Sequence, residues 1–308
     1  MRKRLQNRIA GSRWALPVCT VYAVAISLIA EANHDSMWLQ LGMVGLATLL
    51  MVELNNSNAL IRIYSRMVSC SFLALTMMTP QIMRSFEGCI VSICTVAFYI
   101  AICKAYQNKT ATGSVFYAFV AIGAASMAWV HYLLFVPLLW LLLATNILAM
   151  SWRTFWASVI GLLLPYWFQI SYLLYQGDIM PMVNHLAQLS DFGKPLALQI
   201  FDIHETASLV FLALLTITGS IHFVRTSFKD KIRTRMIYEM FIVMAFASMA
   251  FILLQPQHAI MTTRILITST APLIGHFIAL TTTRTTNYST LAIIFATLAI
   301  TSFNLWMQ

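Results

Sequence analysis

Residues 206–235 read TASLVFLALLTITGSIHFV followed directly by RTSFKDKIRTR. The first 19 residues contain no Asp, Glu, Lys or Arg, and the last 11 contain five basic residues. An apolar run of about 20 residues is long enough to cross the hydrocarbon core of a bilayer as a helix. Basic loops next to such helices stay on the cytoplasmic side. This stretch therefore predicts one membrane span and the face at which it ends.

The composition of the whole chain is that of a membrane protein. Of its 308 residues, 60% are hydrophobic and only 9% are charged, whereas a soluble domain has about 25% charged residues. The net charge of +9 would suggest a nucleic-acid partner in a soluble protein. Here the excess lies in short loops, so we expect membrane lipids with anionic headgroups, and no nucleic acid, as partners. The five cysteines lie in or beside apolar runs without metal-binding spacing, which predicts buried thiols.

The unit of apolar run and short gap repeats along the chain. The runs cover residues 14–31, 37–54, 64–82, 88–104, 113–130, 132–150, 154–175, 206–224, 236–254, 260–281 and 288–307. No separate soluble domain fits between them. We therefore predict an all-α, polytopic transmembrane bundle of about eleven spans, in which residues 1–308 form a single transmembrane domain. The basic N-terminus and first run also resemble a secretory signal, but the run's length and the many runs after it favour an uncleaved helix.

Residues 113–150 decide whether the count is ten or eleven. As one helix, at ~1.5 Å per residue, they would be nearly twice as long as the ~30 Å hydrocarbon core. Two helices with a turn near Trp129 to Tyr132 fit the core and keep Arg153 on the basic face. The first of these helices is rich in small residues, which let helix backbones approach closely in lipid, so we expect it to be central in the bundle.

Positive charge alternates between successive gaps. Sixteen of the 19 Lys and Arg residues lie in gaps on one face, and only Arg84, Lys194 and Arg264 fall on the other. By the positive-inside rule the first face is cytoplasmic. This predicts a multi-pass protein of the bacterial inner membrane with its N-terminus in the cytoplasm and its C-terminus outside.

One outer gap, residues 176–205, is long enough to have its own structure. Met182, Val183, Leu186 and Leu189 recur there with helical spacing, although the segment is too polar to span a membrane. We expect a helical lid or hairpin lying at the membrane surface.

The outer face also collects most other ionisable side chains. Seven of the ten acidic residues and five of the seven histidines fall there, including two clusters, Glu31 with His34 and Asp35, and Asp202 with His204 and Glu205. A carboxylate beside a histidine could act as a general base or as a metal ligand. Acidic residues are equally typical of helix ends, where they cap the helix or face its dipole. The sequence leaves both interpretations open, and with them any metal or cofactor requirement.

Arg264 is the most unusual single residue. It lies inside an apolar run, where a charge costs at least ~2.5 kcal/mol near the centre of a span. The run begins only just before it, after His258, so its side chain could also reach the outer surface. We predict Arg84, Arg264, His258 and His131 as substrate-binding residues, because arginine binds phosphate or carboxylate well.

Four segments carry a resemblance to a known family. They are residues 58–66, 123–140, 152–166 and 271–274. Over most of its length the chain resembles an uncharacterised family of polytopic inner-membrane proteins of Bacteroidota, a domain of unknown function. This resemblance implies a location but no activity.

The order of features is similar to that of a second family. A basic loop, a span ending in Pro80 before Arg84, a hairpin over residues 113–150 and a late span with Pro272 follow one another. This order resembles C-type glycosyltransferases, which use a lipid-phosphate-linked sugar donor at the outer face. Their catalytic carboxylate usually follows the first span, in a large outer loop, which here is short.

That resemblance implies Asp35 or Glu31 as the catalytic residue. Either would deprotonate an acceptor hydroxyl, while Arg84 and Arg264 neutralise the phosphate of a lipid-linked glycan. Our leading hypothesis is therefore action on a lipid-linked glycan or similar envelope lipid at the outer leaflet. The alternative is a non-enzymatic scaffold of an envelope-assembly complex, or a transporter, and the sequence does not decide whether the chain is an enzyme.

Overall fold

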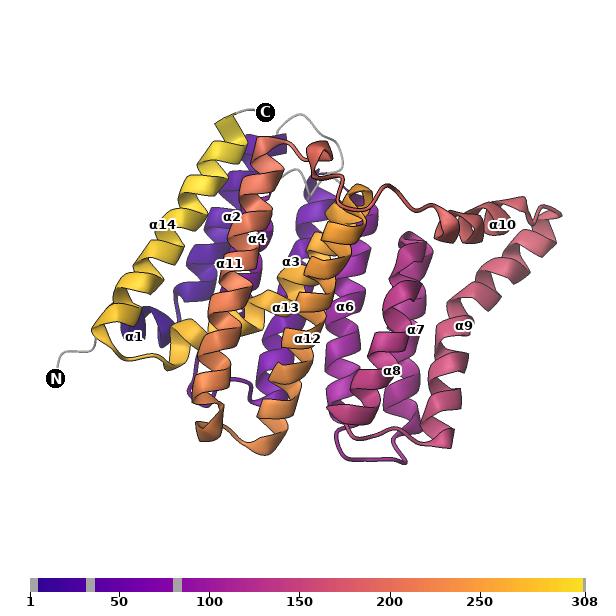
Figure 1. The fold of residues 1–308 in the computed structure, drawn as a ribbon, viewed down its shortest axis with the longest axis horizontal. Coiled ribbons are helices and arrows are strands. Elements are labelled where there is room, and N and C mark those ends of the chain that lie inside the picture. Colours follow the sequence, from indigo (N-terminus) through magenta and orange to yellow (C-terminus); the bar gives the residue numbers. More distant parts are fainter. Residues whose placement is uncertain (1–4, 32–36, 80–84, 307–308) are drawn as a thin grey trace.

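The computed structural model describes residues 5–31, 37–79 and 85–306, and these residues form a bundle of helices without strands (Figure 1). The helices of the bundle are α2 (Ala15–Glu31), α3 (Met37–Asn58), α4 (Met67–Met78), α6 (Phe86–Lys104), α7 (Thr112–Ala128), α8 (Val136–Thr145), α9 (Trp152–Gln176), α11 (Ile203–Thr226), α12 (Ile232–Leu254), α13 (Ala259–Leu280) and α14 (Arg284–Trp306). A short helix, α1 (Leu5–Ala10), precedes them. The all-α prediction is confirmed.

Within the described residues, seven helices are long and apolar enough to cross a membrane: α3, α6, α9, α11, α12, α13 and α14. Four shorter apolar helices, α2, α4, α7 and α8, accompany them. The chain is therefore a polytopic helical membrane protein. The predicted hairpin over residues 113–150 is present as α7 and α8, joined by the 3-10 turn η1 (Val130–Phe135).

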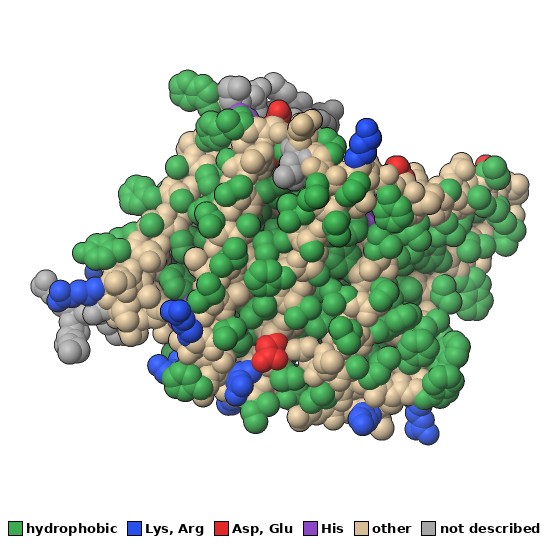
Figure 2. Space-filling view, in the orientation of Figure 1, with side chains coloured by type: hydrophobic (Ala, Val, Ile, Leu, Met, Phe, Trp, Pro, Cys, Tyr) green, Lys and Arg blue, Asp and Glu red, His purple; other side chains and the backbone are tan. Residues whose placement is uncertain are grey.

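Charge distinguishes the two ends of the bundle. Most of the Lys and Arg side chains visible in Figure 2 lie along its lower edge, which we call the basic end; we call the opposite end the outer end. At the basic end, the backbone N–H of Gln6 in α1 donates to Asn287 Oδ1 (3.1 Å) in α14. At the outer end, Asn304 Nδ2 of α14 donates to the Met78 carbonyl (2.7 Å) of α4. Helix α1 and the last turn of α14 thus lie at opposite ends of the bundle (Figure 1).

Helix α13 forms the centre of the bundle, running obliquely through it (Figure 1). Nineteen of its 22 residues are buried, against five of 25 in α9 and four of 23 in α14. Its buried residues include the polar side chains of Arg264, His276 and the hydroxyl run 268–270. Its hydroxyl groups find partners on neighbouring helices, since Ser269 Oγ lies 2.8 Å from Tyr99 Oη of α6 and Thr270 Oγ1 lies 2.8 Å from Thr216 Oγ1 of α11. Such bonds contribute about 0.6 kcal/mol each on average.

Helix α7 was expected to be central, but that place belongs to α13. The small residues of α7 instead let it pack very closely against α9. A Cβ atom added to Gly123 would lie 2.5 Å from the Leu162 carbonyl oxygen, and one added to Gly161 would lie 2.5 Å from the Phe116 carbonyl oxygen. Each glycine therefore faces the backbone of the other helix, where no larger residue fits without separating the two.

The substitution Gly123→Ala is expected to destabilise the protein, because the new methyl group would push α9 away from α7. Overpacking of this kind costs about 1–3 kcal/mol, measurable as a lower midpoint of thermal unfolding in detergent. Gly113→Ala is the matched control in the same helix, since a Cβ there meets no atom within 4 Å. Equal midpoints for the two variants would contradict the proposed close packing.

Candidate functional site

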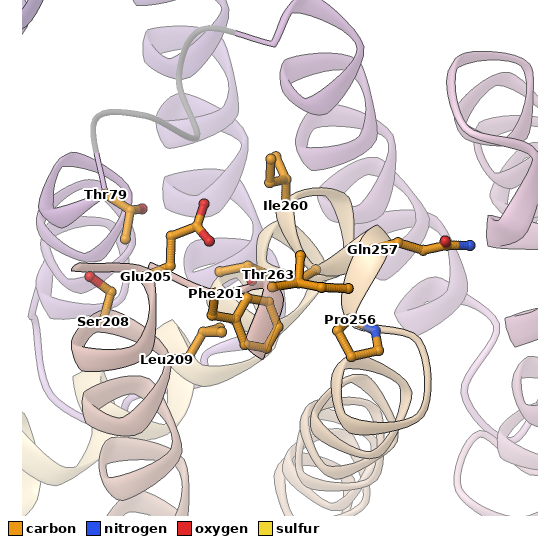
Figure 3. Close-up of a pocket in the computed structure, with 11 residues that line it drawn as sticks. Thr79, Phe201, Glu205, Ser208, Leu209, Pro256, Gln257, Ile260 and Thr263 are labelled. Carbon is orange, nitrogen blue, oxygen red and sulfur yellow. The ribbon is translucent and has the colours of Figure 1, made fainter. Parts of the chain in front are cut away.

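A cavity of about 200 Å³ lies at the outer end, between α4, α11 and α13 (Figure 3). Its polar lining includes Thr79 after α4, Glu205 and Ser208 of α11, and Thr263 of α13, while Phe201 of the outer loop contributes an aromatic ring. The Glu205 carboxylate points between Thr79 on one side and Thr263 on the other (Figure 3). This carboxylate lies in the first turn of α11, where the helix dipole favours a negative charge.

Next to this cavity, α11 and α14 bury polar atoms that lack partners. His204 is only 6% exposed, and its ring packs against Phe303 with centroids 4.2 Å apart. Three buried atoms have no hydrogen-bond partner in the described part of the chain: His204 Nδ1, His204 Nε2 and Asn304 Oδ1. Asn304 is connected to the cavity, since its Nδ2 donates to Ser208 Oγ (3.0 Å). An unsatisfied buried polar group costs about 1–3 kcal/mol, so these atoms are free to hydrogen-bond a water molecule or a ligand.

Arg264 is buried rather than extended to the surface. Its side chain is only 1% exposed, and Nη1 donates to Cys89 Sγ at 3.5 Å. A Cβ atom added to Gly88 would lie 2.9 Å from Arg264 Nε, so glycine at this position lets the guanidinium lie against the start of α6. Thr263 lines the cavity while Arg264 faces α6, so the positive charge lies beside the cavity and not in its described wall.

His131 and His258 come together from distant parts of the chain. Their ring centroids are 3.8 Å apart, and their Nε2 atoms lie 3.2 and 3.3 Å from the main-chain oxygen of Asp191. Gln257 Nε2 donates to the same oxygen at 3.0 Å. We call His131, Gln257, His258 and the Asp191 carbonyl the histidine clasp. It fastens the outer loop to the turn η1 and to the turn before α13.

The outer loop has the helical structure predicted for it. It contains α10 (Met180–Ala187) and the 3-10 turns η2 (Gln188–Ser190) and η3 (Leu198–Ile200). Besides the histidine clasp, His185 Nε2 lies 3.0 Å from the Ser126 carbonyl of α7, and the Gly193 N–H donates to Gln255 Oε1 at 2.9 Å. These contacts hold the loop over the bundle, where it supplies Phe201 to the cavity.

The described residues bring together only some of the predicted site residues. His131 and His258 are paired in the histidine clasp, and neither is among the described residues that line the cavity. The side chain of Glu31, and Asp35 and Arg84 entirely, lie outside the described residues. The cluster of Asp202, His204 and Glu205 forms no group suited to a metal ion within the described part of the chain. It does supply Glu205 to the cavity and the buried His204.

Sequence reasoning missed Ser208 and Asn304. Asn304 carried the only available signal, a carboxamide inside the last apolar run, yet nothing in the sequence places it beside α11. Together the carboxylate, imidazole, hydroxyl and amide groups form a set that can hydrogen-bond a polar headgroup and accept a proton from it. No protein-family model, curated protein or solved structure matches this chain.

The histidine clasp contains a neutral imidazole. Burial lowers the pKa of His131 and the adjacent His258 ring lowers it further, while the hydrogen bond to the Asp191 carbonyl and the Asp191 carboxylate raise it. The pKa lies below the ordinary value of about 6.5, so at pH 7 the His131 ring is neutral and its Nε2–H donates to the Asp191 carbonyl at 3.2 Å.

Hydrogen exchange of residues 188–196 is expected to be faster in His131→Phe than in the wild type, because the Asp191 carbonyl loses one of its donors. His131→Gln keeps an N–H donor and should exchange more like the wild type. His185→Gln is the matched control, because it removes another loop contact but leaves the histidine clasp intact. Equal exchange of residues 188–196 in His131→Phe and the wild type would refute this assignment.

Proposed function

We propose that the chain is an eleven-span protein of the bacterial inner membrane that binds the headgroup of a lipid-linked glycan or similar envelope lipid at the outer leaflet. The observation that carries the proposal is the buried His204 ring, which has no partner in the described protein and lies beside a cavity containing Glu205. Sugar hydroxyls and phosphate oxygens supply the donors and acceptors that such groups need. The order of features shared with C-type glycosyltransferases supports the same substrate class.

The topology rests on the short helices as well as the long ones. Helix α4 has only 12 residues, but 11 of them are buried by its neighbours, so lipid does not set its length. Counting α2, α4, α7 and α8 as spans gives eleven crossings. The N-terminus then lies in the cytoplasm with the basic end, and the C-terminus lies outside.

The proposed chemistry uses the groups around the cavity. Glu205 takes the proton of an acceptor hydroxyl while the hydroxyl oxygen bonds to the anomeric carbon of the sugar. The bond from that carbon to the phosphate oxygen breaks, and the lipid phosphate leaves with the electron pair. The buried charge of Arg264, one residue from the cavity wall, stabilises the developing negative charge. Asp35 and Glu31 remain alternative predictions for the base that deprotonates the acceptor hydroxyl. Arg84 remains a predicted ligand of the lipid phosphate.

The test uses purified protein and a short-chain polyprenyl-phosphate sugar, with binding followed by native mass spectrometry and transfer by release of the polyprenyl phosphate. Glu205→Gln should leave binding largely intact but lower transfer at least 100-fold, since a general base contributes about 10²- to 10⁴-fold. His204→Phe should weaken binding while keeping or raising the unfolding temperature, because it replaces unsatisfied polar atoms by an apolar ring.

Two controls separate site effects from damage. Gly88→Ala keeps every charge but displaces the Arg264 guanidinium. The rate of sugar transfer by this variant should therefore fall, with little change in its binding of the polyprenyl-phosphate sugar. Glu53→Gln, on the basic-end half of α3, should change neither. The enzymatic proposal would fail if His204→Phe bound the polyprenyl-phosphate sugar as tightly as the wild type and the wild type transferred no sugar. That result would favour the scaffold or transporter.

The topology has its own test. A reporter that is active only outside the cytoplasm, fused after Gln308, should be active, and the same reporter fused after Lys229 should be inactive. A fluorescent protein that folds only in the cytoplasm should give the reverse pattern. The same result at both positions would contradict the eleven-span arrangement.

A further inference from the structure

A second cavity of about 560 Å³ lies on the side of the bundle, between α11 and α14. Helix α11 lines it with Phe211, Leu215 and Ile221, helix α14 lines it with Ile293 and Ala296, and Phe277 of α13 closes its floor. We call it the lateral groove. From Phe211 to Arg225, 14 residues of α11 extend about 21 Å at ~1.5 Å per residue. That length exceeds one leaflet of a ~30 Å hydrocarbon core.

The polarity of the lateral groove changes along its length. Its middle is apolar apart from Thr218, whose hydroxyl donates to the Leu214 carbonyl of its own helix (2.9 Å). At the basic end it is lined by His222, Arg225 and Ser289. The lateral groove is therefore apolar over at least the depth of one leaflet and basic at one end. A phospholipid has the matching shape, with apolar acyl chains and a charged headgroup.

Within the described ranges, no acidic side chain neutralises the charge of Arg225. Asp230 is the acidic residue on the loop that follows α11, and it is engaged elsewhere. Its Oδ2 lies 3.0 Å from His276 Nε2, and its Oδ1 lies 3.8 Å from Arg62 Nη1. Among the described residues no carboxylate pairs with Arg225, which is exposed. A guanidinium at the surface of an anionic leaflet binds phosphate oxygens with two parallel hydrogen bonds.

We propose that the lateral groove is a binding site for one anionic phospholipid of the cytoplasmic leaflet. One acyl chain lies along α11 and α14, and Arg225 and His222 hold the phosphate. The site also contacts the centre of the bundle, because the His222 ring lies 5.7 Å from that of His276 and 5.1 Å from that of Phe277, both in α13. The bound lipid is therefore in contact with the same helix that lines the outer cavity at its other end.

The test is native mass spectrometry of the delipidated protein titrated with phosphatidylglycerol or phosphatidylcholine of identical acyl chains. The wild type should retain one phosphatidylglycerol at least tenfold more tightly than phosphatidylcholine. Arg225→Gln should remove that preference, and Ala292→Trp, which fills the groove, should reduce retention of both lipids. Arg153→Gln is the matched control, because this exposed arginine also lies at the basic end but on α9, at the opposite edge of the bundle from α14 (Figure 1).

Three outcomes would overturn the proposal. The first is equal retention of the two lipids by the wild type. The second is an equal loss in Arg225→Gln and Arg153→Gln, which would show attraction to the basic end in general. In the third, glycerol 3-phosphate displaces phosphatidylglycerol completely, and it does so equally well from Ala292→Trp. That result would show a phosphate site that does not bind an acyl chain. Because Arg225 and Ala292 are exposed, unfolding temperatures of these variants should equal that of the wild type.

Discussion

The structure depends on one constraint: polar atoms inside a bilayer must find partners within the protein. Helix α13 contains an arginine, a histidine and several hydroxyl side chains, and 19 of its 22 residues are buried by neighbouring helices. Its hydroxyls, Arg264 and His276 would each be costly against lipid. Few residues of α9 and α14, at the edges of the bundle, are buried, and the four buried residues of α14 are all polar.

Both candidate sites are consequences of this central polar helix. At the outer end of α13, Thr263 lines the cavity that contains Glu205. Toward its basic end, His276 bonds to Asp230 and Phe277 lines the lateral groove. One helix, with Pro272 inside it, thus runs from one candidate site to the other. Any change in its tilt or position would be felt at both.

The sequence was sufficient to predict features that depend on local pattern. Apolar runs gave the helices, the length of residues 113–150 gave the hairpin, and the spacing of Met182 and Leu186 gave the helical outer loop. Features that depend on long-range packing could not be predicted. His131 and His258 meet because η1 and the turn before α13 lie side by side, and Asn304 reaches Ser208 because α14 packs on α11. Local pattern does not identify α13 as central either, because α14 is as rich in Thr and Ser and yet lies at the edge.

The burial of α13 has a consequence for biosynthesis. A segment that contains an arginine and a histidine, as α13 does, is poorly retained in lipid on its own. It comes late in the chain, after α4, α6, α11 and α12, the helices against which it packs. Ribosomal synthesis therefore presents α13 to the membrane only when its partners are already inserted. Moving this segment earlier in the chain, as in a circular permutant, would leave it without a place to insert, although every contact of the mature protein would remain available.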